Sequence, residues 1–250
     1  MCGRYSLTTP AEAMRHLFGF AGALPNLPAR YNIAPTQLVP VVRLAQERRA
    51  GGGPGEAVGE VERGTRELVQ LRWGLIPSWA KDAAIGNRLI NARAEGLAEK
   101  PSFRAAFRAR RCLVPADGFY EWQATPHGKR PYRIGLKGGS ADALPLFAFA
   151  GLWERWQKAP DGAPVESCTI VTTAANELLA PIHERMPVIL PEDGYAAWLA
   201  PATPPEAALA LLKPYPAAAM LLYPVSKRVN NVRFDDALCI APESAESSLL

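Results

Sequence analysis

The chain has little cysteine and little histidine, with 4 and 3 residues among 250. The cysteines, at positions 2, 112, 168 and 239, form no CxxC pair, and together with the widely spaced histidines they make no zinc-binding pattern. The sequence therefore predicts no structural metal, and we expect no cofactor.

Long apolar runs are also missing. No stretch of about 18 apolar residues could span a bilayer, and the opening MCGRYSLTTP lacks the apolar segment of a signal peptide. These absences predict a cytoplasmic protein with no membrane partner, in a reducing compartment where thiols stay unpaired.

A strong net charge is absent as well. The total is only +4, which does not by itself indicate a nucleic-acid-binding protein. The charge is unevenly spread, because residues 1–130 carry 19 basic and 11 acidic side chains, a net +8, whereas residues 131–250 carry a net −4. We expect any anionic partner to meet the first half of the chain.

The first half of the chain predicts short elements separated by turns. The whole chain has 48% hydrophobic residues, enough to form a core, and its 24 Pro and 20 Gly favour turns between short strands. We expect a helix over 10–18 and strands over 38–44 and 67–75. Between those strands the Gly-rich segment 46–64 is interpreted as a mobile hairpin loop, inserted between strands that pair with each other.

The chain after about residue 100 predicts a helix and then strand-like runs that alternate with turn clusters. A basic amphipathic helix is predicted over 102–111, with Arg111 on one of its outer faces. From Cys112 to about 174 the pattern predicts one antiparallel meander, and helices follow over 192–199 and 205–212. The fold class expected is therefore α+β, a single domain with a curved, barrel-like antiparallel sheet and short flanking helices.

Cys2 is the first residue with unusual chemical potential. Removal of Met1 would give a 1,2-aminothiol whose α-amine, with a pKa of about 7.7 to 8.0, and thiol, about 8.5, are both partly deprotonated near neutral pH. The amine could form a Schiff base with an aldehyde, and the thiolate could then close a thiazolidine ring. Taken alone, Cys2 is more simply read as an incidental residue at a frayed terminus.

Three further features have possible chemical roles. Residues 72–95 mix tryptophans with cations, as single-stranded nucleic acid requires; Trp73 is predicted to lie in the core and Trp79 to offer a stacking surface. Glu121, inside a strand-like run, is expected to have a raised pKa and to serve as an acid or base, unless it faces outward. His183 is a candidate proton carrier, and Arg185 would share its side of an extended backbone.

Eight motifs follow one another along the chain: CGRY, RYNIAPTQ, RWGLIPSWA, INARAE, CLVPADGFYEW, FAGLWERW, PIHERMPVIL and VNNVR. Together they resemble the SOS response-associated peptidase family, whose members shield abasic sites in single-stranded DNA. The resemblance runs from Cys2 to about Val232, and it implies a domain over 1–235 with the insertion at 46–64 and a C-terminal tail over 236–250.

The resemblance also implies residue roles and a positively charged DNA channel. Cys2 would be the nucleophile, Asn91 would position the sugar or the reacting terminus, Glu121 would move protons, and His183 would act on the oxygen of the ring-opened deoxyribose or in reversal. The DNA-binding residues implied are Arg4, Asn32, Trp79, Arg93, Lys100 and Arg185. Where relatives can carry a second Trp beside Trp79, this chain has Ala80.

The activity expected is a covalent thiazolidine crosslink to abasic single-stranded DNA during replication or the SOS response, with possible autopeptidase and lyase or reversal activity. We expect a monomer that associates with the nucleoid when bound to DNA. Two alternatives remain open at this point. One is an N-terminal-nucleophile amidohydrolase that uses the Cys2 thiol on an amide, and the other is a noncovalent single-strand-binding module.

Overall fold

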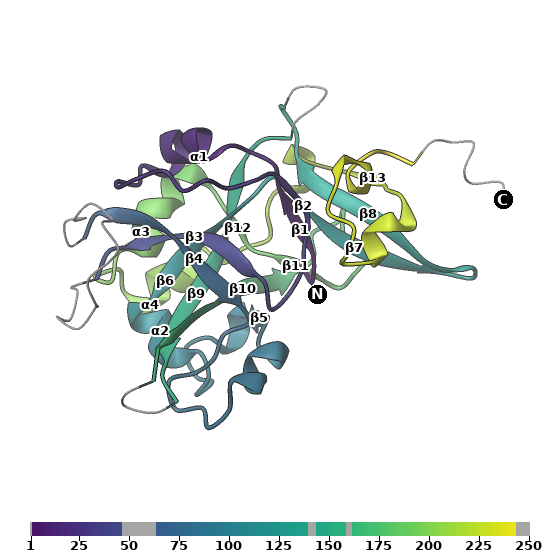
Figure 1. Cartoon of the computed structure of the whole chain (residues 1–250). Helices are drawn as coiled ribbons and strands as arrows, with labels where there is room; N and C mark the ends of the chain where they lie inside the picture. Colours follow the sequence, from purple (N-terminus) through teal and green to yellow (C-terminus); the bar gives the residue numbers. More distant parts are fainter. Residues whose placement is uncertain (1, 47–63, 140–143, 159–161, 244–250) are drawn as a thin grey trace.

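The computed structural model describes residues 2–46, 64–139, 144–158 and 162–243, and its centre is a closed five-stranded β-barrel (Figure 1). The strands follow one another around the barrel in the order β10, β4, β3, β6 and β9, and β9 pairs again with β10. Their bounds are β3 Leu38–Leu44, β4 Arg66–Trp73, β6 Arg111–Ala116, β9 Phe147–Trp156 and β10 Val165–Ala174.

One neighbouring pair in the barrel, β10 and β4, is parallel, and the other pairs are antiparallel. An odd number of strands cannot alternate in direction all the way round a closed ring, so at least one parallel pair is required. The α+β class and the barrel-like sheet predicted from the sequence are confirmed, with this parallel pair as the departure from a wholly antiparallel sheet.

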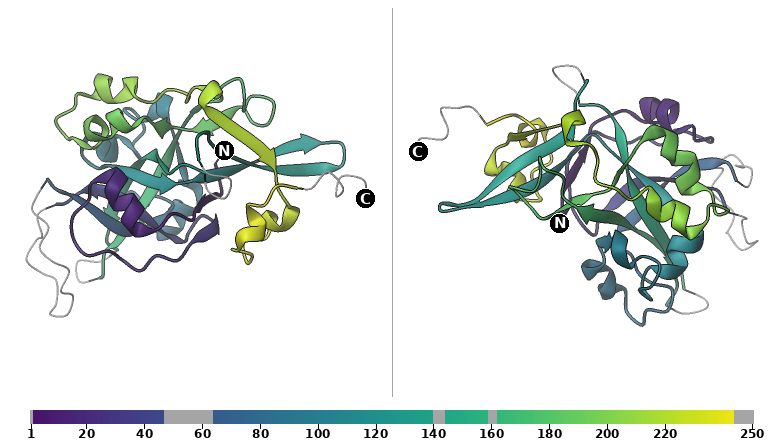
Figure 2. Two further views of the ribbon diagram at one scale, coloured as in Figure 1. Left: turned by 90° about the horizontal axis from the view of Figure 1, so that it is seen from above. Right: turned by 180° about the vertical axis from the view of Figure 1, so that it is seen from behind.

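A second sheet lies beside the barrel and is antiparallel throughout. Its strand order is β13, β8, β7, β1 and β2. The bounds are β1 Tyr5–Leu7, β2 Arg30–Ile33, β7 Gly118–Thr125, β8 Gly128–Leu136 and β13 Met220–Pro224. The β7–β8 hairpin extends well beyond the barrel, and the segment after β13 lies beside it (Figure 2).

Short strands and helices complete the molecule. The strands β5 Asn91–Arg93, β11 Arg185–Pro187 and β12 Ile189–Leu190 pair with the barrel strands β10 and β9. The α-helices are α1 Ala11–Phe18, α2 Arg104–Ala109, α3 Tyr195–Leu199 and α4 Pro205–Ala210. The 3-10 helices are η1 Ala83–Arg88, η2 Ala94–Gly96, η3 Glu192–Gly194, η4 Ala217–Ala219, η5 Lys227–Asn230 and η6 Ala237–Cys239. No helix in the described part of the chain is long and apolar enough to cross a membrane.

The single meander predicted after Cys112 is wrong, although its strands exist. The run CLVPADGFYEW divides at Asp117 into β6, which joins the barrel, and β7, which joins the second sheet. β8 and β9 are consecutive but lie in different sheets, because β9 pairs with β6 and β10 instead. Period-two patterning identifies strands but does not choose their partners.

The predicted basic helix is shorter than expected, and Arg111 is not on its surface. Arg111 begins β6 and is only 4% exposed. Its guanidinium donates to the main-chain oxygens of Phe107, Trp198 and Ala200, which are the carbonyls at the ends of two helices. These main-chain oxygens provide hydrogen-bond acceptors for the buried Arg111 guanidinium, which the sequence pattern predicted to be exposed to solvent.

The strands on either side of the Gly-rich segment pair as predicted. The ladder runs from Leu38 opposite Arg72 to Leu44 opposite Arg66. Residues 47–63, which make up most of the predicted loop, lie outside the described residues, and so do the last residues of the predicted tail.

Candidate active site

The position of Cys2 follows from the pairing of β1. Tyr5 of β1 lies opposite Phe119 of β7, and the main-chain N–H of Tyr120 donates to the oxygen of Arg4 at 3.0 Å. Cys2 therefore lies beside the middle of β7, and it is fully buried. Burial raises the pKa of the Cys2 thiol far above its ordinary value, and the negative charge of Glu121 raises it further.

Asn91 holds the main chain of Cys2. It lies at the first position of β5, which pairs in parallel with β10 so that Asn91 is opposite Ile170. Its side-chain Nδ2 donates to the oxygen of Cys2 at 2.8 Å. Its Oδ1 is buried and has no hydrogen-bond partner among the described residues, so an acceptor is available next to Cys2.

Glu121 and His183 line the same hollow, although they come from different parts of the chain. The hollow has a volume of about 420 Å³ and opens to solvent. It is lined by Arg4, Glu121, Trp122, Lys129, His183 and Asn230. We call it the Glu121 hollow.

Glu121 is only 3% exposed, and burial raises the pKa of its carboxyl group. Nearby His183 and the main-chain N–H of Trp122 oppose part of that rise. A carboxyl whose pKa moves toward neutrality can both take up and return a proton, which is what a general acid and base requires. The sequence-based expectation of a raised pKa for Glu121 is confirmed.

Arg4 and Asn32 together fix the segment that forms the far wall of the hollow. Arg4 donates to Asn32 Oδ1 at 2.8 Å, to the oxygen of Val229 at 2.7 Å and to the oxygen of Asn230 at 3.3 Å. Asn32 is fully buried, and its Nδ2 donates to the oxygens of Val229, Asn231 and Phe234. The Asn32 side chain therefore binds the main chain of the segment 229–234. The DNA contact expected for Asn32 stays a prediction.

Comparison with known proteins identifies the protein family of this chain. A family model described as SOS response associated peptidase (SRAP) matches residues 1–232. The chain belongs to the SRAP family.

Relatives and solved structures agree with this assignment. The abasic site processing protein YoqW of Bacillus subtilis is 42% identical over 252 residues, covering 99% of this chain and all of that protein. The abasic site processing protein HMCES of Gallus gallus is 33% identical, covering 73% of this chain and 60% of its own length. A crystal structure of a Bacteroides thetaiotaomicron protein superposes with a TM-score of 0.81 at 25% identity, covering 97% of this chain and 100% of that one.

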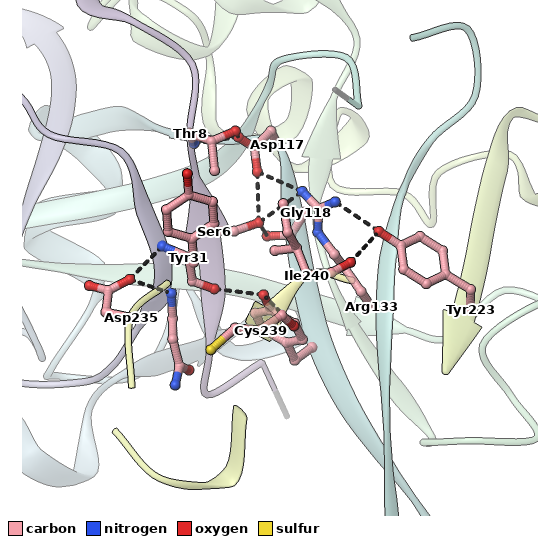
Figure 3. Close-up of polar contacts among 12 residues, drawn as sticks. Ser6, Thr8, Tyr31, Asp117, Gly118, Arg133, Tyr223, Asp235, Cys239 and Ile240 are labelled. Carbon is pink, nitrogen blue, oxygen red and sulfur yellow. Dashed lines mark hydrogen bonds and ion pairs between the residues drawn. The ribbon is translucent and has the colours of Figure 1, made fainter. Parts of the chain in front are cut away.

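A buried polar network joins the N-terminal strand of this SRAP chain to β7 (Figure 3). Asp117 accepts from Ser6 Oγ at 2.6 Å, from the main chain and Oγ1 of Thr8, and from Arg133 Nη2 at 3.0 Å. Arg133 Nη1 in turn donates to the hydroxyl of Tyr223 at 2.9 Å. This network fixes the strand that delivers Cys2 relative to the strand that carries Glu121.

The remaining predicted DNA-binding residues of the SRAP chain lie outside the hollow, in two groups. Trp79 is 56% exposed, and its Nε1 donates to the oxygen of Pro101 at 3.3 Å, which brings it near exposed Lys100. Arg93 is exposed on β5, and Arg185 lies on β11; both strands pair with the C-terminal end of β10. The DNA contacts of all four stay predictions.

Sequence reasoning missed three residues of the hollow: Trp122, Lys129 and Asn230. Trp122 Nε1 donates to Asn230 Oδ1 at 2.7 Å, which links β7 to the segment after β13. Both residues lay within motifs that carried the SRAP resemblance, so the signal was present. Lys129 had no such signal, because only the β7–β8 pairing brings it back toward Glu121. No group of three or more His, Cys, Asp or Glu side chains in the described ranges is arranged to hold a metal ion.

Proposed function

We propose that this chain processes abasic sites in single-stranded DNA by forming a covalent crosslink through Cys2 after removal of Met1. The observation that carries the proposal is that four residues from separate elements lie close together. Asn91 holds buried Cys2, the charge of Glu121 acts on the Cys2 thiol, and Glu121 and His183 line the Glu121 hollow. The printed names of the relatives, abasic site processing proteins, support the same substrate.

The chemistry follows from the two nucleophiles of an N-terminal cysteine. An abasic deoxyribose opens to an aldehyde, the Cys2 amine adds to the carbonyl carbon, and loss of water gives an iminium. The Cys2 sulfur then adds to the same carbon and its proton leaves, which closes a thiazolidine. Overall one water is lost and no oxidant is needed. Closure of the ring protects the DNA, because an open Schiff base would permit β-elimination and strand scission.

Glu121 has the environment needed to move the protons. Addition of the amine requires that it lose protons, dehydration requires one to be delivered to the leaving hydroxyl, and ring closure removes one from the thiol. The Cys2 thiol has a strongly raised pKa, so it is protonated at rest and needs a base beside it. The buried Glu121 carboxyl supplies that base, and such transfers typically contribute about 10²–10⁴-fold in rate.

Affinity without sequence preference would come from the exposed cations and the exposed ring of Trp79. Arg93 and Lys100 are exposed and can pair with phosphates, and Trp79 offers a face on which a base can stack. Action as a monomer, a place in replication or the SOS response, a cytoplasmic or nucleoid location, and any autopeptidase, lyase or reversal activity are part of this proposal.

Intact-mass spectrometry tests the proposal directly. The purified protein, before and after incubation with a single-stranded oligonucleotide carrying one abasic site, should lose Met1 and then gain the mass of the oligonucleotide less one water. Cys2→Ala keeps an α-amine but lacks the thiol, so it should give a borohydride-trappable Schiff base and strand cleavage with no stable adduct. A stable adduct in that variant, or none in the parent, would refute the proposal.

The two alternatives give different outcomes in matched assays. A Cys2-dependent release of ammonia from glutamine would indicate an amidohydrolase. Equal binding of intact and abasic strands, insensitive to Cys2→Ala and without an adduct, would indicate a noncovalent module.

A further inference from the structure

The basic segment that follows η2 has no part in the function proposed above, and its four arginines divide into two pairs. Arg110 pairs with the Glu154 carboxylate at 2.7 Å, and Arg111 is buried against main-chain oxygens. Arg104 and Arg108 are exposed, and neither makes an ion pair or a side-chain hydrogen bond with any residue in the described ranges. Packing therefore accounts for two of these arginines and not for the other two.

Three exposed cations share one side of this helix, and we call them the basic face of α2: Lys100, Arg104 and Arg108. The main-chain N–H of Arg104 donates to the oxygen of Lys100 at 2.9 Å, so the helical turn already begins at Lys100. Residues four apart lie one above the other on a helix. The step from Lys100 to Arg108 corresponds to a rise of about 12 Å. The range 100–116 contains no acidic residue, so no carboxylate within this stretch offsets the three charges.

A continuous set of contacts joins the basic face of α2 to the Glu121 hollow. His183, which lines the hollow, contacts the main-chain N–H of Arg185, whose guanidinium pairs with Glu95 of η2. The Lys100 side chain lies against Gly96 of the same η2, because a Cβ added at Gly96 would be 3.0 Å from Lys100 Cε. In Figure 1 the N-terminus lies between the β7–β8 hairpin and β5, and α2 lies beyond β5. The basic face therefore extends away from the hollow on the side opposite the hairpin.

The exposed ring of Trp79 lies at the start of this face, because its Nε1 donates to the oxygen of Pro101 at 3.3 Å. A row of cations beside an exposed aromatic ring is how proteins hold single-stranded nucleic acid, with phosphates on the cations and a base on the ring. We propose that the basic face of α2 binds phosphates of one flank of the DNA strand, beyond the abasic nucleotide. This inference rests on the proposed function, and it adds Arg104 and Arg108 to the DNA-binding residues. The contacts with DNA are then asymmetric, because only one flank of the strand reaches α2.

The salt dependence of binding tests the phosphate contacts. A single strand that carries a tetrahydrofuran abasic analogue has no aldehyde, so fluorescence anisotropy measures binding without crosslinking. Arg104→Gln and Arg108→Gln should each reduce the slope of log affinity against log salt by about 0.7–1, and the double variant by about twice as much. Lys137→Gln is the control, because it removes an exposed charge in the second sheet, where Lys137 donates to the oxygen of Ala218, and it should leave the slope unchanged. Thermal melting checks that each variant is folded. An unchanged slope in the folded double variant would overturn the proposal and would favour an acidic protein partner for this face.

Two oligonucleotides with the same analogue test the asymmetry. One has about two nucleotides on the 5′ side of the analogue and about ten on the 3′ side, and the other has the reverse arrangement. The Arg104→Gln/Arg108→Gln variant should bind one of them about tenfold more weakly than the parent does and the other equally well. Equal losses on both would indicate a general effect of charge and contradict the proposal. If the parent binds these strands but forms no adduct with a natural abasic site, the proposed function fails, while the flank comparison still decides the role of α2. If the parent binds neither strand, the DNA contact at α2 is refuted.

Discussion

Replacing Asp117 by Asn should destabilise the protein more than any single change on its surface. Asp117 is 1% exposed and Arg133 is 3% exposed, and their side chains meet at 3.0 Å in the network between β1, β7 and β8. Asn removes the charge but keeps the shape. Arg133 is then left as a buried cation with only neutral acceptors: the amide oxygen of the new side chain, Ser6 Oγ and the Tyr223 hydroxyl.

The expected cost is about 3–5 kcal/mol, the usual penalty for removing one partner of a buried ion pair. Arg133→Met should cost less, about 1–3 kcal/mol, because the Asp117 carboxylate would keep three hydrogen-bond donors from Ser6 and Thr8. The order of the two variants, with Asp117→Asn the less stable, is therefore the specific prediction.

Urea denaturation followed by tryptophan fluorescence measures both variants, and the double variant completes a cycle. The double variant should be more stable than Asp117→Asn alone, since it no longer buries an unpaired cation. A cost below about 1 kcal/mol for Asp117→Asn, or the reverse order of the single variants, would refute the reasoning. Because the network positions Cys2 beside Glu121, Asp117→Asn should also slow crosslinking under conditions where it remains folded.

Four further predictions concern function and stability. Glu121→Gln should slow crosslinking by about 10²–10⁴-fold, and the parent rate should fall as the pH drops through the raised Glu121 pKa, where the base is protonated. Because the pKa of Glu121 is raised in the folded state, Glu121 has no effect on the free energy of unfolding below the ordinary glutamate pKa. It lowers that free energy as the pH rises through the raised pKa. Glu121→Gln should therefore raise the melting temperature at neutral pH but not at pH 3. Trp79→Ala should weaken single-strand binding by about 1–3 kcal/mol in fluorescence anisotropy, whereas Leu238→Ala, at a similarly exposed apolar position, should leave it unchanged. Arg93→Gln should reduce the slope of log affinity against log salt by about one, and an unchanged slope would exclude a phosphate contact at Arg93.

Local patterns predicted many of the elements correctly. Strand β3, the pairing of β3 with β4, helix α1 and the core position of Trp73 all follow from periodicity and turn residues. The division of the run at Asp117 did not follow, because it depends on Ser6 and Thr8, more than 100 residues earlier in the chain.

The candidate site divides in the same way. The sequence marked Cys2, Glu121 and His183 through their chemistry, and the family motifs added Asn91. The sequence could not show that Asn32 is buried, that Glu95 pairs with Arg185, or that Lys129 lines the Glu121 hollow. Each of these facts is a contact between segments far apart in the chain.

By itself, the sequence determined the family, the kinds of reactive group and the presence of a strand-rich fold, because these depend on residue identity and on local spacing. Tertiary structure alone decided which strands close the barrel, how deeply Cys2 and Glu121 are buried and which main-chain N–H meets the ring of His183. The physical reason is that burial, pKa and hydrogen-bond direction depend on neighbours brought together by the fold.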